Sequence, residues 1–153
     1  NSLTDKVLIN KLIEASQAGV YIDMVVRGIC CLRAGVPDET ENIHIISIVG
    51  RYLEHSRIYI FGQGERARYY IGSADWMTRS TLRRVEIAAP VTAPALKARL
   101  QHIFDTMLAD NCNARVQQPD GSYVRRLPGA DAVDCQAQFY EEAYQANVHS
   151  SLK

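Results

Sequence analysis

The sequence predicts an α/β fold in which helices flank a mixed β-sheet. Three observations support this prediction. The chain has 153 residues, of which 47% are hydrophobic, enough for one domain with its own core. Short β-branched runs occupy the first two thirds of the chain, and segments with helical periodicity lie near both ends. This mixture is typical of a layered α/β domain, so we expect a single domain over residues 1–153.

The first helix is predicted to begin at Thr4 or Asp5 and to end at Gly19. The run VYIDMVV, residues 20–26, is apolar and β-branched, as in a buried parallel strand. Arg27 directly follows the carboxyl end of this strand. Ligands of open α/β sheets bind outside the carboxyl ends of strands, which makes Arg27 a candidate ligand-binding residue.

The middle of the chain predicts four more strands. Residues 43–49 form one. Residues 57–61 and 68–71 form a hairpin around a glycine-rich turn. Residues 83–91 form another strand, which ends near Pro90.

The last third of the chain predicts two helices joined by a hairpin. The segment 93–110 has an apolar stripe made of Leu96, Leu100, Ile103, Phe104 and Met107. Residues 114–126 are predicted to form a hairpin around a Pro-Asp-Gly turn. Residues 134–150 are predicted to form a closing helix with Phe139, Tyr140 and Tyr144 on its apolar side.

The kind of positive charge is more informative than its amount. The net charge is zero, which argues against general nucleic-acid binding. Thirteen arginines stand against four lysines, and nine of the arginines lie between Arg27 and Arg84. Arginine binds phosphate and carboxylate through two parallel hydrogen bonds, so this segment favours an anion site. The alternative explanation is that the base composition of the genome favours arginine over lysine.

The cellular location is predicted from the four cysteines and from the targeting signals that the sequence lacks. The chain has no C-x-x-C pair, no secretory signal and no apolar run near the roughly 20 residues of a membrane span. We therefore expect reduced thiols in a cytoplasmic protein, with peripheral binding at the inner membrane face as a second location. The chain begins at Asn1 without an initiator methionine, and we expect it to be part of a longer protein.

The hairpin at residues 57–71 carries the chemistry. His55 and Arg57 are two residues apart at the start of a strand, which places both side chains on one face. The histidine can exchange a proton, and the arginine can hold a phosphate that the histidine faces. The turn Gly72–Asp75 closes the second strand and is predicted to direct Ser73 and Asp75 to the same place. For Asp75, an orienting role and a turn-forming role are both open.

This stretch resembles the phospholipase D signature, H-x-K-x4-D followed by G-x-x-N. Three positions depart from the signature: Arg57 replaces the lysine, Gly62 the aspartate and Asp75 the asparagine. These departures argue against ordinary phosphodiesterase chemistry. A phosphodiesterase or nuclease subunit that completes its site by dimerising is the alternative function, and a non-catalytic interaction domain is a third.

A closer resemblance covers residues 1 to about 91. The stretches NSLTD, ASQAGVYIDMVVRGICCLRAGVP, SIVGRYLEHSRIYIF, SADWM and RRVE resemble the last domain of bacterial polyphosphate kinases. The resemblance implies a phospholipase D-like fold and a reversible transfer of the terminal phosphate of ATP to polyphosphate. It also implies that the histidine that becomes phosphorylated lies on another domain.

The resemblance also implies the roles of individual residues. Arg27 and His55 match positions that bind nucleotide phosphates, and Arg83 or Arg84 lies near them. Arg57 is expected to bind phosphate, and His55 to act in acid–base catalysis or phosphate binding. No residue of this chain is expected to bind a metal directly, and Mg²⁺ is expected to arrive with the nucleotide. The expected partners are ATP or ADP, polyphosphate, the other domains of the enzyme and further copies of it.

Overall fold

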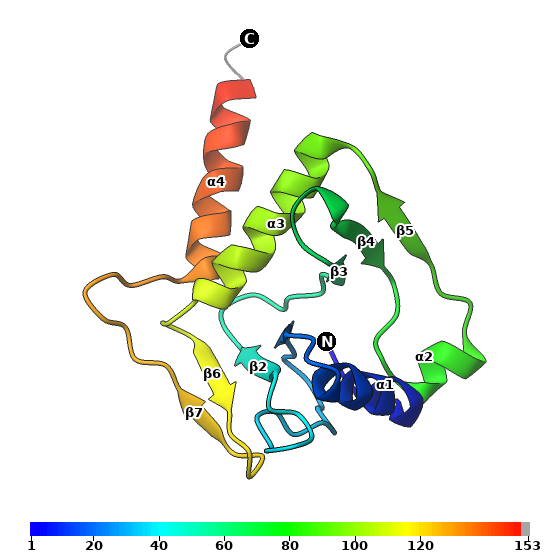
Figure 1. Cartoon of the computed structure of the whole chain (residues 1–153). Helices are drawn as coiled ribbons and strands as arrows, with labels where there is room; N and C mark the ends of the chain where they lie inside the picture. The colour runs from blue at the N-terminus through cyan, green and yellow to red at the C-terminus, as the bar shows by residue number, and fades with distance from the viewer. Residues whose placement is uncertain (151–153) are drawn as a thin grey trace.

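The computed structural model describes residues 1–150, with side chains up to Val148. Both helices and strands occur in this part of the chain (Figure 1). They are α1 (Lys6–Gln17), β1 (Ile22–Val25), β2 (Ile43–Ile48), β3 (Ile58–Phe61), η1 (Gly64–Arg66), β4 (Arg68–Gly72), α2 (Thr78–Arg83), β5 (Ala88–Val91), α3 (Pro94–Ala109), β6 (Ala114–Gln117), β7 (Tyr123–Arg125) and α4 (Cys135–Ser150). The predicted α/β class is confirmed.

The mixed sheet has the strand order β1-β2-β6-β7. β1 and β2 are parallel, with Ile22 opposite Ile43, and β6 and β7 add antiparallel strands as the predicted hairpin. All four residues of β1 are half-buried. The predicted parallel strand is therefore present, but the prediction that it is fully buried is wrong. Within residues 1–150, no strand pairs with the outer edge of β1.

A second sheet has the order β3-β4-β5 and is antiparallel throughout. The predicted hairpin is its first two strands. The strand predicted over residues 83–91 is wrong in its first half, because only Ala88–Val91 pairs as a strand. Pro90 is tolerated there since β5 is an edge strand.

The helix α2 includes only Arg83 of the predicted strand, and residues 84–87 connect α2 to β5. It covers Thr78–Arg83 and packs against the start of α1, where the Thr81 hydroxyl donates to Asp5 Oδ2 at 2.9 Å. Asp5 itself caps α1 by accepting from the backbone N–H groups of Val7 and Leu8. The contact with α1 is long-range in sequence, so local pattern does not reveal it.

The core lies on both faces of β2. Ile43 and Ile45 pack in a cluster with residues of α1 and β1, and Ile46 and Ile48 pack in a second cluster with residues of α3, β6 and α4. Successive residues of a strand point to opposite faces, which is why one strand serves both clusters.

Three residues predicted on apolar helix faces are exposed. Leu96 of α3 is 56% exposed, and Tyr140 and Tyr144 of α4 are 58% and 54% exposed. Phe139, by contrast, packs against the core as predicted. Figure 1 shows α4 extending away from the sheets, so its outer turns have little to pack against within residues 1–150. No helix in this described range is long and apolar enough to span a bilayer.

Asp110 is a buried carboxylate that organises the C-terminal third. It is fully buried, and its Oδ1 accepts backbone N–H bonds from Cys112, Asn113 and Ala114, while Oδ2 accepts one from Cys135 at 2.9 Å. Burial alone would raise the pKa of Asp110, but these hydrogen bonds bring it below its usual value. The side chain thereby holds the end of α3, the start of β6 and the start of α4 together.

We expect Asp110→Asn to lower the free energy of unfolding by about 2 kcal/mol at pH 7, because hydrogen bonds to a charged acceptor are lost. The folded-state pKa is lower than the unfolded value of about 3.9, so the carboxylate stabilises the fold above that value. The contribution disappears as the pH falls through the folded-state pKa. Urea titrations should show the difference between variant and parent at pH 7 and its decrease below pH 4. A constant difference across this range would contradict the assignment.

Candidate functional site

His55 and Arg57 lie side by side just before β3, as their spacing predicts. Arg57 Nη1 donates to the His55 carbonyl at 3.1 Å and lies 3.4 Å from His55 Nδ1. His55 is exposed, and the side chain of Arg57 is only 15% exposed. The arginine therefore contacts the backbone carbonyl and one ring nitrogen of the histidine and leaves the rest of the ring accessible to solvent.

Asp75 fixes Arg57 from the other side. Its Oδ1 accepts from Arg57 Nε at 3.1 Å, and its side chain is 14% exposed. Burial opposes ionisation of Asp75, but the Arg57 hydrogen bond together with the positive charges of Arg57 and the Asn1 nitrogen lowers the pKa of Asp75. Of the two roles open for Asp75, the geometry supports an orienting group for Arg57.

Arg27 reaches the same place from the end of β1. Its Nε donates to the Glu54 carbonyl at 2.7 Å, which ties Arg27 to the peptide that precedes His55. Among residues 1–148, no hydrogen bond or ion pair occupies Nη1 or Nη2 of Arg27. Two terminal N–H groups are thus open to an anion beside the histidine.

A contact from Asn1 completes the cluster and is not predicted by the sequence. Asn1 Nδ2 lies 3.3 Å from Nδ1 of His55. The backbone nitrogen of Asn1 lies 3.5 Å from Asp75 Oδ1. These contacts join the start of the chain to residues more than fifty positions away, and a motif search within the hairpin has no signal for them.

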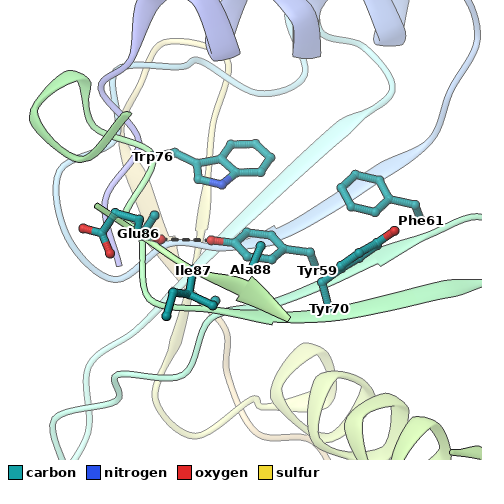
Figure 2. Close-up of a pocket in the computed structure, with 9 residues that line it drawn as sticks. Tyr59, Phe61, Tyr70, Trp76, Glu86, Ile87 and Ala88 are labelled. Carbon is teal, nitrogen blue, oxygen red and sulfur yellow. Dashed lines mark hydrogen bonds between the residues drawn. The ribbon is translucent and has the colours of Figure 1, made fainter. Parts of the chain in front are cut away.

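Aromatic packing holds the turn that carries Asp75. The Tyr59 ring stacks on Trp76 with a centroid distance of 5.6 Å, and the Tyr59 hydroxyl donates to the Ala74 carbonyl at 2.9 Å (Figure 2). A Cβ at Gly72 would meet the Tyr59 ring at 2.8 Å, so only glycine fits there. Trp76 also packs, partly buried, against the core cluster that contains Leu3 and Ile43.

Comparisons with known proteins give the family. The sequence profile described as polyphosphate kinase C-terminal domain 2 matches residues 1–138. The chain belongs to this family. It is 51% identical over 146 residues to a polyphosphate kinase of Bacillus anthracis, covering 95% of the chain and 21% of that protein. It is 56% identical over 130 residues to one from Synechocystis sp., covering 85% of the chain and 18% of that protein.

A solved structure agrees with the sequence comparison. The polyphosphate kinase of Porphyromonas gingivalis superimposes with a TM-score of 0.89 at 38% identity, over 95% of this chain and 22% of that one. The chain therefore spans about a fifth of the length of these polyphosphate kinases. The predicted phospholipase D-like fold is confirmed by this likeness.

Two residues predicted near the cluster lie elsewhere in this polyphosphate kinase domain. The Ser73 hydroxyl donates to Glu86 and accepts from the Ile87 N–H, so the prediction that Ser73 faces the histidine is wrong. Arg84 is 61% exposed and lies 4.0 Å from Glu86 Oε1, and no contact joins it to Arg27 or His55 in the described part of the chain. Its role toward phosphate stays a prediction.

Gly62 explains why the domain departs from the phospholipase D signature at the acidic position. It has a φ of +83° in the turn after β3. A side chain is strained in this left-handed region, so the backbone favours glycine over aspartate there. Residues 1–148 also contain no group of three histidine, cysteine or acidic side chains that could hold a metal ion. The cluster of Arg27, His55 and Arg57 is suited to an anion.

Asp75→Asn tests the orienting role in the longer enzyme. Because the neutral amide holds Arg57 less firmly, we expect the transfer rate to fall about tenfold, equal to roughly 1.4 kcal/mol. The Michaelis constant for substrate should change less than the rate. Asp120→Asn, in the distant β6–β7 turn, is the matched control and should be neutral. An unchanged rate in Asp75→Asn would contradict the orienting role.

Proposed function

We propose that this domain binds the phosphates of ATP, ADP and polyphosphate during the reversible transfer of the terminal phosphate of ATP to a polyphosphate chain. The observation that supports it is the open guanidinium edge of Arg27 beside an exposed histidine. In the forward direction, the bond from the terminal phosphorus to the bridging oxygen of ADP breaks. The phosphoryl group passes to a histidine on another domain and from there to the terminal oxygen of polyphosphate.

The residues of this chain supply binding, orientation and a proton site. Arg27 holds phosphate oxygens through its two terminal N–H groups, and its fixed charge stabilises the charge that shifts to the leaving group. His55 donates a hydrogen bond or a proton to the leaving phosphate. Arg57, held by Asp75, keeps the histidine ring in place and offers its remaining N–H to phosphate.

Magnesium fits this proposal as part of the substrate. The nearby Asp75 carboxylate is paired with Arg57, so phosphate oxygens and water would hold the ion. When bound, Mg²⁺ neutralises part of the phosphate charge. The longer protein is proposed to act in the cytoplasm, with peripheral binding at the inner membrane face as a second location, and to assemble as a homo-oligomer.

The test compares the 153-residue chain with the longer enzyme from which it would derive. The longer enzyme should make polyphosphate from labelled ATP. The chain alone should bind polyphosphate and make none, because the phosphohistidine partner is on another domain. Robust synthesis by the chain alone would refute the division of roles. Hydrolysis of a simple phosphodiester would support a phosphodiesterase instead, and failure to bind any phosphate compound would support a non-catalytic domain.

A further inference from the structure

The two sheets each end in a strand with a free edge. β1 is the last strand of its sheet, and β3 is the last strand of the other. The N–H groups of Ile22 and Val26 donate to the β2 side, so those of Asp23 and Val25 between them point away from it. In β3, the Gly72 N–H donates to the Arg57 carbonyl, which turns the backbone groups of Ile58 and Ile60 away from β4.

Both free edges line one cleft of about 1070 Å³, which we call the inter-sheet cleft. Residues 20–26 form one wall and residues 56–64 the opposite wall. Leu8 and Leu12 of α1 contribute to the cleft, as do Phe104 and Met107 of α3. The cleft thus has unpaired strand edges along two walls and apolar helix side chains along others. The unpaired N–H and C=O groups of a strand edge are a template for pairing with another strand.

The first residues of the chain already lie between the two sheets. Leu3 forms parallel bridges to Cys30, which follows β1, and to Trp76, which follows β4. The Leu3 N–H donates to the Ile29 carbonyl at 2.8 Å. On the other side, the Trp76 N–H donates to the Ser2 carbonyl at 3.1 Å. Residues 2–4 therefore bridge the segment that follows β1 and the segment that follows β4.

The direction of these residues defines where the preceding polypeptide would run. Leu3 is parallel to Cys30, so a strand that leads into Asn1 would run parallel to β1. It is also parallel to Trp76 beyond β4, and β4 is antiparallel to β3, so the same strand would be antiparallel to β3. Asn1 lies beside His55, immediately before β3, and itself lines the cleft. In Figure 1 the chain begins in the space between β3 and α1.

We propose that a β-strand from the polypeptide immediately before Asn1 in the longer protein fills the inter-sheet cleft and joins the two sheets into one mixed sheet. The relatives are about five times longer than the matched segment, which leaves ample chain to supply it. A strand along residues 20–26 needs about seven residues, roughly 23 Å at 3.3 Å per residue. Since helices cover both faces, the strand should be apolar on both faces.

The inserted strand would also order the functional site. It ends at Asn1, whose side chain contacts His55 and whose backbone nitrogen faces Asp75. Anchoring the seven preceding residues fixes the position of Asn1 and hence the orientation of the histidine ring. This role does not depend on which phosphate compound binds at the site.

Hydrogen exchange followed by mass spectrometry tests the proposal in the longer protein and in the 153-residue chain. Peptides that cover residues 20–27 and 57–63 should exchange at least about 100-fold more slowly in the longer protein. Peptides that cover β2, which is paired on both sides in either form, should exchange alike and show that both are folded. A longer protein in which the ten residues before Asn1 are scrambled is the matched control and should lose the added protection.

A second measurement uses Trp76, the single tryptophan, which lines the inter-sheet cleft. A synthetic peptide of those ten residues, added to the 153-residue chain, should shift the emission of Trp76 to shorter wavelength. The scrambled peptide should not. Fast exchange at β1 and β3 in the longer protein would overturn the proposal. Protection that survives scrambling would also overturn it, because another segment would then fill the cleft. Protection of the 153-residue chain that rises with its concentration would overturn it as well, because a second copy would then fill the cleft.

Discussion

Replacing His55 with alanine in the longer enzyme is expected to lower the rate of phosphate transfer by about 10²–10⁴-fold, the usual contribution of a positioned acid–base group. The melting temperature should hardly change. His55 is exposed, and the side chains that contact its ring are those of Asn1 and Arg57. Removal of the ring therefore leaves no buried cavity.

Two measurements decide the role of His55: the steady-state rate with ATP and the acid-labile phosphate retained on the protein. His102→Ala is the matched control, because His102 is an exposed histidine that pairs with Glu142 on α4. The control should keep the parental rate. Normal turnover in His55→Ala would show that the site is misassigned. Loss of all protein-bound phosphate would make His55 itself the nucleophile.

Arg27→Ala is expected to weaken binding of polyphosphate and of an ATP analogue by about 30- to 150-fold, as for a lost charge-assisted contact of about 2–3 kcal/mol. Arg27→Lys should recover only a small part of this affinity. A lysine has no Nε–H to bond the Glu54 carbonyl and no second terminal nitrogen to bind phosphate in parallel.

Titration calorimetry on the longer enzyme measures both variants. Arg99→Ala, at an exposed position of α3, removes the same charge away from the cluster and should bind like the parent. If Arg27→Lys binds as tightly as the parent, charge alone explains the site and the bidentate geometry is unnecessary. If Arg27→Ala also binds normally, Arg27 has no part in phosphate binding.

The features that the sequence predicts well are those encoded by neighbouring residues. Short runs of apolar, mostly β-branched or aromatic residues give the strands at residues 43–48 and 58–61, and the two-residue spacing of His55 and Arg57 places them together. The position of Arg27 at the carboxyl end of a strand is also as predicted, and its phosphate binding stays a prediction. Its link to Glu54 strengthens that prediction without being visible in the sequence.

The features that sequence reasoning misses depend on long-range contacts. α2 forms where Thr81 meets Asp5, and Ser73 turns to Glu86 instead of the histidine. Asp110 has no motif around it, yet it binds backbone groups at the starts of β6 and α4. The separation of the strands into two sheets likewise depends on what pairs with the edge of β1, which local periodicity does not encode.

The double use of β2 has a consequence for how the domain loses its structure. Its isoleucines alternate between the cluster beneath α1 and the cluster beneath α3 and α4. Neither cluster can open without removing one face of the same strand, so each depends on the other for its stability. We infer that the two clusters unfold as a single cooperative unit. A substitution that destabilises either cluster should therefore lower the stability of the whole domain.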